Sequence, residues 1–319
     1  MLNIRARRAN LRRLPRAVVP ARYARAMTHD AVLAADTSLR RTYRYLRLGV
    51  AGTAVVIAVA VAITVAQLGM LESISAAYYT PARDAFVGAL IAASLGLLAL
   101  SGRGVQRGLL DAAALLAPLV AVVPTPVITI AGVEVCGGEA CVPASVHPAV
   151  DTSVATYLVV GALAVAVAVV LGLRRDAGRA ALERVWPSIV LSVIVLAVVW
   201  AWWGLGRESF FGFAHFVATA GFFGILAIVS LLDALRTDWS PEPTPSRAVR
   251  TAYAVIAGLL ALDLVAVTIF VAVGGPAATT FPVVFVCEFV ALALFCLYWV
   301  LQTANTWNQA DPALVGGIG

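Results

Sequence analysis

The sequence contains no lysine and little charge of any kind. Of its 319 residues only 13% are charged, whereas 61% are hydrophobic. A soluble domain carries about 25% charged residues, so this composition excludes an ordinary soluble fold. The apolar residues also fall into blocks of about 20, the length that crosses a hydrocarbon core of ~30 Å. The chain is therefore predicted to lie mostly in a lipid bilayer.

Residues that build common catalytic and metal sites are scarce. The chain has three histidines, spread over three segments, and four cysteines. A catalytic zinc site needs about three protein ligands and an open position. The sequence also has no phosphate-binding glycine loop, no nucleophile–base arrangement, no haem motif and no convincing internal repeat. No cofactor and no metal are expected.

Arginine is abundant at the start of the chain. Residues 1–47 hold twelve arginines against two acids, Asp30 and Asp36. We expect this tail to be partly disordered or to lie on the membrane surface, where each arginine gains about 1 kcal/mol from anionic lipid. Nucleic-acid binding is not expected, because no recognition module accompanies the charge. The apolar span after the tail is longer than the ~7–15 residues of a cleavable signal, so we interpret it as an anchor.

Eight apolar blocks follow the tail. Backbone polar groups in lipid must be satisfied within their own segment, so each block is predicted to be a helix. The predicted fold class is all-α, a polytopic transmembrane bundle of eight helices in residues 48–302, with a short tail at 303–319. The predicted spans are Leu48–Leu68, Ala85–Ser101, Leu109–Ile130, Val154–Leu173, Val185–Trp203, Phe210–Leu232, Ala252–Val273 and Val283–Leu301. Prolines at 118, 124 and 126 are expected to bend the third span or end it early.

Arginine placement predicts the direction of the helices. If the N-terminus is cytoplasmic, twenty-one of the 23 basic residues fall inside the cell, and only Arg83 and Arg207 fall outside. An excess of arginine in cytoplasmic loops is the usual pattern of membrane proteins, and one span more or fewer would destroy it. We therefore expect both termini to be cytoplasmic and the protein to reside in the plasma membrane.

Two cysteines, Cys136 and Cys141, flank Gly-Gly-Glu-Ala in the longest predicted outer loop. On an oxidising side of the membrane this spacing favours a small disulfide loop; two free thiols are the alternative. Cys287 and Cys296 lie in the last span, where we interpret them as small buried apolar residues.

Ionisable groups at membrane depth indicate function, because burying charge in lipid is expensive. Asp263 lies in the middle of the seventh span, and His215 and Glu288 lie near the outer ends of the sixth and eighth. The stretch 73–88 on the same side is dense in hydroxyl, tyrosine and charged groups. We predict one outward-facing polar pocket that also includes the Ser73 and Ser75 hydroxyls. Its candidate binding residues are Tyr78, Tyr79, Arg83, Asp84, His215, Asp263 and Glu288.

A purely structural interpretation of the same residues stays open. Asp84 could serve only to cap a helix, Arg83 could extend to the interface, and His215 could form a hydrogen bond to Glu288 between two helices. Asp263 fits this alternative least well, because no interface lies within its reach.

Three motifs resemble a group of uncharacterised bacterial polytopic membrane proteins that are distantly similar to DRAM/Sfk-type membrane proteins. The first is Ser73-Ile-Ser-Ala-Ala-Tyr-Tyr-Thr-Pro-Ala-Arg-Asp-Ala-Phe-Val-Gly88, and the second is the phenylalanine-rich stretch His215–Phe223. The third is Glu288 followed by the aromatic patch from Phe295 to Trp299. The resemblance implies about six helices, so the fourth and fifth spans would be insertions, and it implies no particular activity.

Three functions are compatible with these features. The first is binding or transport of a lipid or small polar solute through the polar pocket. The second is an accessory or assembly subunit of a membrane complex, with partner subunits in the membrane. The third is an intramembrane metal-dependent lipid hydrolase, which the scattered histidines disfavour.

Replacing Asp263 tests whether the pocket is functional. We expect Asp263→Asn to change ligand retention or activity while leaving thermal stability nearly unchanged, because an isolated carboxylate in lipid contributes little to folding. Thermal unfolding and mass analysis of co-purified ligand measure the two effects. A variant identical to wild type in both would remove Asp263 from the functional residues.

Overall fold

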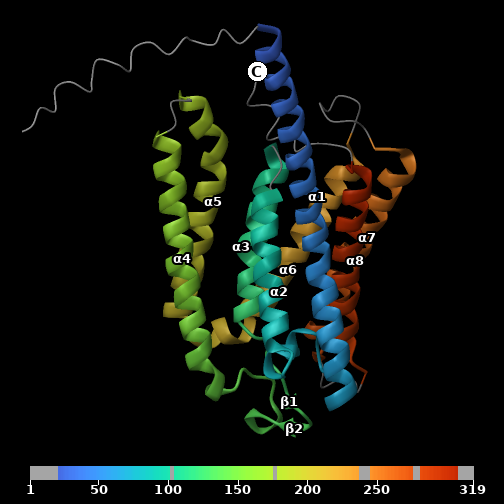
Figure 1. Cartoon of the computed structure of the whole chain (residues 1–319). Coiled ribbons are helices and arrows are strands. Elements are labelled where there is room, and N and C mark those ends of the chain that lie inside the picture. Colours follow the sequence, from blue (N-terminus) through green and yellow to red (C-terminus); the bar gives the residue numbers. More distant parts are fainter. Residues whose placement is uncertain (1–20, 101–103, 175–177, 237–244, 276–280, 308–319) are drawn as a thin grey trace, which may run out of the picture.

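The computed structural model describes residues 21–100, 104–174, 178–236, 245–275 and 281–307 (Figure 1). Within these ranges eight α-helices are long and apolar enough to cross a membrane. They are α1 (Ala21–Leu68), α2 (Arg83–Leu100), α3 (Gly104–Val122), α4 (His147–Arg174), α5 (Gly178–Leu205), α6 (Arg207–Ala234), α7 (Arg247–Ala272) and α8 (Val283–Asn305). The predicted all-α transmembrane bundle of eight helices is confirmed; its direction relative to the cell stays a prediction.

The third predicted span is wrong at its C-terminal end. It was expected to reach Ile130, but α3 ends at Val122. Pro124 follows closely, and the ring of a proline disfavours helical geometry in the residue before it. Pro118 lies inside α3 without ending it, so of the three prolines only those at 124 and 126 fall beyond the helix.

The first helix begins inside the predicted arginine-rich tail. α1 starts at Ala21 and continues without interruption through residue 47 (Figure 1). Its arginines near that boundary contact the end of α8: Arg44 Nε donates to the Trp307 carbonyl at 2.6 Å, and Arg47 donates to the Thr306 hydroxyl. Residues 1–20 and 308–319, which complete the two predicted tails, lie outside the described residues.

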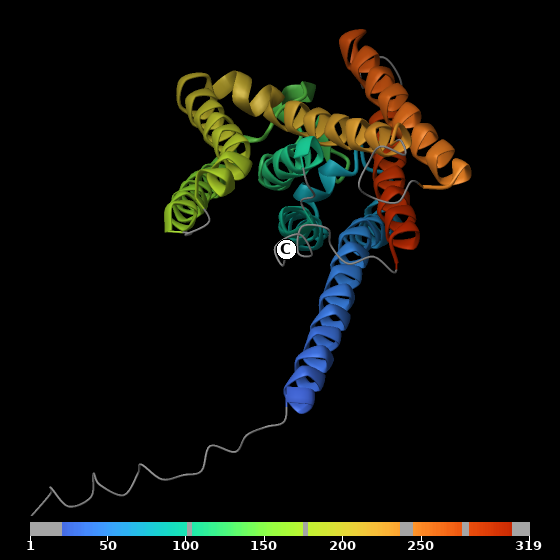
Figure 2. The same ribbon diagram turned by 90° about the horizontal axis from the view of Figure 1, so that it is seen from above.

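Six of the helices close into a ring. Neighbours pack in the order α1, α2, α3, α6, α7, α8 and back to α1. The largest buried cluster joins all six, with Leu97, Ala114, Phe222, Leu260 and Tyr298 among its members. Figure 2 shows α4 and α5 as a separate pair at one side of this ring. The pair packs mainly on α3 and α6, so six helices form the body of the protein and two are an addition to it.

One end of the bundle carries a small β-hairpin, and we call it the hairpin end. Strands β1 (Thr129–Ile130) and β2 (Val133–Glu134) pair antiparallel through the turn Ala131-Gly132, where both residues have positive φ, as a two-residue hairpin turn requires. The Cys136–Cys141 disulfide follows directly, which confirms the predicted pair. The short helix η2 (Ser75–Tyr79) lies at the same end (Figure 1).

The helix directions separate the arginines between the two ends of the bundle. Among residues with described side chains, Arg83 and Arg207 begin α2 and α6 at the hairpin end. The opposite end holds both described chain ends and a larger set: Arg41, Arg44, Arg47, Arg107, Arg236, Arg247 and Arg250.

A buried carboxylate connects three helices at the opposite end. Asp233 on α6 is 1% exposed. It accepts hydrogen bonds from Gln106 Nε2 of α3 at 2.8 Å, from the Tyr298 hydroxyl of α8 at 2.8 Å and from Arg236 at 2.7 Å. The sequence analysis does not single out Asp233, because it lies near the end of an apolar span, but its side chain points into the bundle.

Removing this carboxylate should destabilise the bundle. We expect Asp233→Ala to lower the free energy of unfolding by about 3–5 kcal/mol, because it leaves the Arg236 charge and the Tyr298 hydroxyl buried without their acceptor. Tyr298→Phe should cost about 1.5–3 kcal/mol, the value of one hydrogen bond to a charged group. Unfolding of the purified protein in detergent measures both.

The matched control for these two variants is Glu139→Ala, in the exposed loop at the hairpin end. It should stay within about 0.5 kcal/mol of wild type. If Asp233→Ala behaved like this control, the buried network would not hold the helices together.

Candidate functional site

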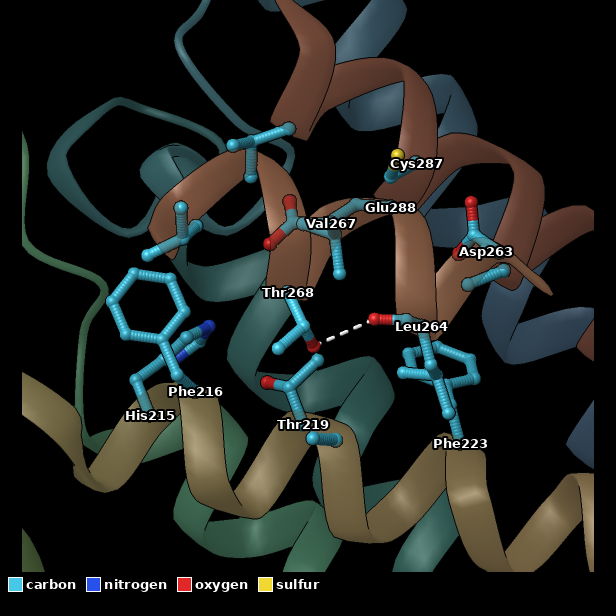
Figure 3. Close-up of a pocket in the computed structure, with 14 residues that line it drawn as sticks. His215, Phe216, Thr219, Phe223, Asp263, Leu264, Val267, Thr268, Cys287 and Glu288 are labelled. Atoms are coloured by element: carbon cyan, nitrogen blue, oxygen red, sulfur yellow. Dashed lines mark hydrogen bonds between the residues drawn. The ribbon is translucent and has the colours of Figure 1, made fainter. Parts of the chain in front are cut away.

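A cavity of about 170 Å³ lies between α6, α7 and α8, towards the hairpin end (Figure 3). Three of the predicted binding residues line it, one from each helix: His215, Asp263 and Glu288. At 1.5 Å per residue they lie about 8–14 Å along their helices from the hairpin end. The remaining lining residues are mostly apolar: Phe216, Thr219, Ala220, Phe223, Leu264, Val267, Thr268, Val271, Val284, Cys287 and Ala291.

The imidazole of His215 is held from one side and free on the other. The side chain is 1% exposed, and Nδ1 lies 2.7 Å from the carbonyl oxygen of Val123, just beyond α3. A carbonyl can only accept, so Nδ1 carries the hydrogen, and in a neutral imidazole Nε2 is then an acceptor. Among the described residues, the buried Nε2 has no hydrogen-bond partner. His215 is one of the residues of α6 that line the cavity.

Glu288 is held in place by the loop between α1 and α2. The Ser75 amide donates to Oε2 and the Ser75 hydroxyl donates to Oε1, both at 2.9 Å. A carboxylate has about four lone-pair positions, so Glu288 keeps room for another donor from the cavity. Both serine hydroxyls were predicted to lie in the pocket. In the structure the Ser75 hydroxyl positions Glu288, whereas the Ser73 hydroxyl accepts a hydrogen bond from the Ala76 amide.

Two further side chains extend the polar part of the cavity. The Thr219 hydroxyl of α6, one turn from His215, is buried and has no partner. The Thr268 hydroxyl of α7 donates to the Leu264 carbonyl at 2.7 Å (Figure 3). Neither threonine was predicted, because a single threonine in an apolar helix usually bonds to its own backbone.

Cys287 corrects a sequence interpretation. It was expected to be a small buried apolar residue, but it lines the cavity beside Glu288 and lies next to the Asp263 carboxylate. Cys296, by contrast, packs against the main apolar cluster as expected.

The other four predicted binding residues do not line this cavity. Arg83 donates to the Tyr78 hydroxyl at 2.6 Å, and its guanidinium lies 4.1 Å from the centre of the Tyr78 ring. Burial raises the pKa of Tyr78, and the nearby Arg83 charge opposes that rise. Tyr78 and Arg83 therefore satisfy each other. Asp84 is exposed in the first turn of α2, where the helix dipole favours a carboxylate.

Tyr79 belongs to a second hollow, of about 220 Å³, beneath the β-hairpin. Its hydroxyl donates to the Thr125 carbonyl at 2.8 Å, and burial raises its pKa. Glu72, which the sequence analysis did not single out, accepts from the Ile128 amide at 3.0 Å and from the Thr129 amide at 2.7 Å. These bonds attach the hairpin to the loop before α2, so the polar groups of this hollow hold the loops at the hairpin end together.

The hydrogen bond between His215 and Glu288, which belonged to the alternative structural interpretation, is absent from the described part of the chain. Each side chain instead bonds to backbone or loop groups, at Val123 and Ser75 respectively. Among the described residues no three or more His, Cys, Asp or Glu side chains form a group that could hold a metal ion. The cavity is therefore amphipathic, with two carboxylates, one histidine nitrogen that lacks a partner among the described residues, and mostly apolar walls.

Comparison of the chain with protein-family models, with curated proteins and with solved structures gave no match. The resemblance drawn from the three motifs stays a prediction.

The contact between Ser75 and Glu288 predicts a measurable coupling. Ser75→Ala removes one hydrogen bond to a carboxylate and should lower the free energy of unfolding by about 1.5–3 kcal/mol. Combined with Glu288→Gln in a double-mutant cycle, the two changes should show a coupling energy of about 1 kcal/mol or more.

Ser73→Ala, combined with Glu288→Gln in the same way, is the control. Its hydroxyl bonds only to the Ala76 amide, so coupling should stay below about 0.5 kcal/mol. Equal coupling for both serines would mean that Ser75 does not position the carboxylate.

Proposed function

We propose that this protein binds a lipid or small polar solute in the cavity between α6, α7 and α8, for retention in or transport across the membrane. The observation that carries the proposal is the buried Nε2 of His215, which lacks a partner in a mostly apolar cavity. A buried acceptor left unpaired costs about 1–3 kcal/mol. A ligand that donates a hydrogen bond would remove that cost.

The shape of the cavity supports an amphipathic ligand. Its walls are mostly apolar, while its polar groups are few and come from three different helices, the arrangement typical of small-molecule sites. The volume of about 170 Å³ is close to that of an engineered cavity of about 150 Å³ that holds benzene. It therefore suits a head group or a small solute rather than an entire lipid.

The proposed direction is outward. The hairpin end carries the disulfide, which favours an oxidising compartment, and few arginines, whereas the opposite end is rich in them. On this basis both termini would be cytoplasmic, the arginine-rich start of the chain would contact anionic lipid, and the cavity would open towards the outer half of the plasma membrane.

An accessory role in a membrane complex is the second proposal, and the α4–α5 pair favours it. In the span Ala144–Leu171 only 6% of the most apolar window is buried within the protein. Such a helix offers a large apolar face to lipid or to a partner subunit. The metal-dependent hydrolase finds no support in the described side chains, which form no group suited to a metal ion.

Filling the cavity tests the binding proposal. Ala220 of α6 lines the cavity and is exposed at its rim. Ala220→Phe should remove most co-purified ligand, by about tenfold or more, because the new ring occupies the space that the ligand needs. Native mass spectrometry of the purified full-length protein measures the bound fraction.

Ala266→Phe is the matched control, because Ala266 is an exposed alanine of α7 that does not line the cavity. Its bound fraction should equal that of wild type. If wild type carried no ligand, or if both variants retained it equally, the cavity would not be the binding site.

A further inference from the structure

The hydrogen-bonding groups of the cavity are mainly acceptors. Asp263 and Glu288 contribute carboxylate oxygens, and His215 contributes the free lone pair of Nε2. The hydroxyl hydrogen of Thr268 is already used by the Leu264 carbonyl, so only its lone pairs remain. The Cys287 thiol, a weak donor, lies next to Asp263. Among the described lining residues, the Thr219 hydroxyl is the one hydroxyl donor without a partner.

The charges lining the cavity have one sign. Two carboxylates face it, and no arginine is among its lining residues; the sequence contains no lysine. Carboxylates at membrane depth normally pair with a cation or with several donors. Glu288 accepts two hydrogen bonds from Ser75, which leaves it further lone-pair positions, and Asp263 lies next to the weak thiol donor of Cys287. The missing partner is therefore a cation with hydrogen atoms to donate.

The rim of the cavity opens towards lipid. Ala220 of α6 and Thr268 and Val271 of α7 line it and are exposed, and all three lie within membrane-spanning segments. Figure 3 shows the Glu288 carboxylate extending from α8 across the cavity between α6 and α7. A ligand can thus place a polar head beside Glu288 and His215 while its apolar chain stays in the bilayer.

We propose that the ligand of this cavity is an amphiphile with a primary ammonium head. Three N–H groups on one nitrogen suit a cavity whose acceptors, Glu288, His215 Nε2 and the Thr268 hydroxyl, come from three helices. A quaternary ammonium has no hydrogen to donate and would leave Nε2 unpaired, whereas a carboxylate or phosphate head would face two like charges. This inference rests on the proposed binding function and specifies its ligand class.

Three ligands that share the same alkyl chain but differ in their head group test the inference. Full-length protein in phosphatidylcholine nanodiscs is titrated with dodecylamine, dodecyltrimethylammonium and dodecanol, and binding is followed by native mass spectrometry. We expect dodecylamine to bind at least about tenfold more tightly than the other two. Glu288→Gln and Asp263→Asn should each weaken dodecylamine binding about tenfold. Glu208 is an exposed acid at the start of α6, so Glu208→Gln should leave this affinity unchanged.

The outcomes separate this inference from the proposed function. If all three ligands bind equally and Ala220→Phe abolishes all binding, the cavity is a binding site but the ammonium preference is wrong. If none binds and Ala220→Phe has no effect, the proposed function itself fails. If Glu288→Gln does not fold, Asp263→Asn and Thr219→Val replace it when the binding of the three ligands is compared with that of wild type.

A second arm identifies the source of the amine. Nanodiscs that contain phosphatidylethanolamine replace those made of phosphatidylcholine alone. If the ligand is a lipid head group, the aminophospholipid should compete and weaken dodecylamine binding by about tenfold. If dodecylamine binds equally in both lipids, the ligand is a free amphiphilic amine. Either result supports an ammonium site.

Discussion

Polar side chains buried between membrane helices must find partners within the protein, because lipid offers none. Two carboxylates meet this requirement at opposite ends of the six-helix ring. Asp233 takes donors from α3 and α8 as well as from its own helix, and Glu288 takes two from Ser75. The helix order around the ring and the position of the loop before α2 both depend on these contacts.

The same requirement distinguishes structural groups from the proposed binding groups. Tyr78 with Arg83, Glu72 with the hairpin amides, and Asp233 with its donors are each satisfied internally. His215 Nε2 and Thr219 Oγ1 are not, although both are buried. They lie one turn apart on α6 and line one cavity. The His215 lone pair without a partner is the observation on which the proposed binding function depends.

Part of the site was predictable, and the rest depended on which way each helix faces. Depth in the membrane selected His215, Asp263 and Glu288, because ionisable groups far from water are costly, and the structure brings these three to one cavity. Depth could not show that Arg83 and Tyr78, five residues apart, satisfy each other. It also undervalued Asp233, which lies near a helix end but points inward. Thr219 and Cys287 carry no charge, so nothing in the sequence pattern separated them from their apolar neighbours.

The sequence by itself determined that the chain lies in a membrane, how many helices it forms and which cysteines pair, because block length, arginine spacing and short loops are properties of consecutive residues. The end of α3 at Val122 also has a local cause, because Pro124 follows it closely in the sequence. Only the tertiary structure decided that α6, α7 and α8 meet around a cavity while α4 and α5 stand aside. Convergence of side chains depends on helix rotation and on neighbours distant in sequence, which no local pattern encodes.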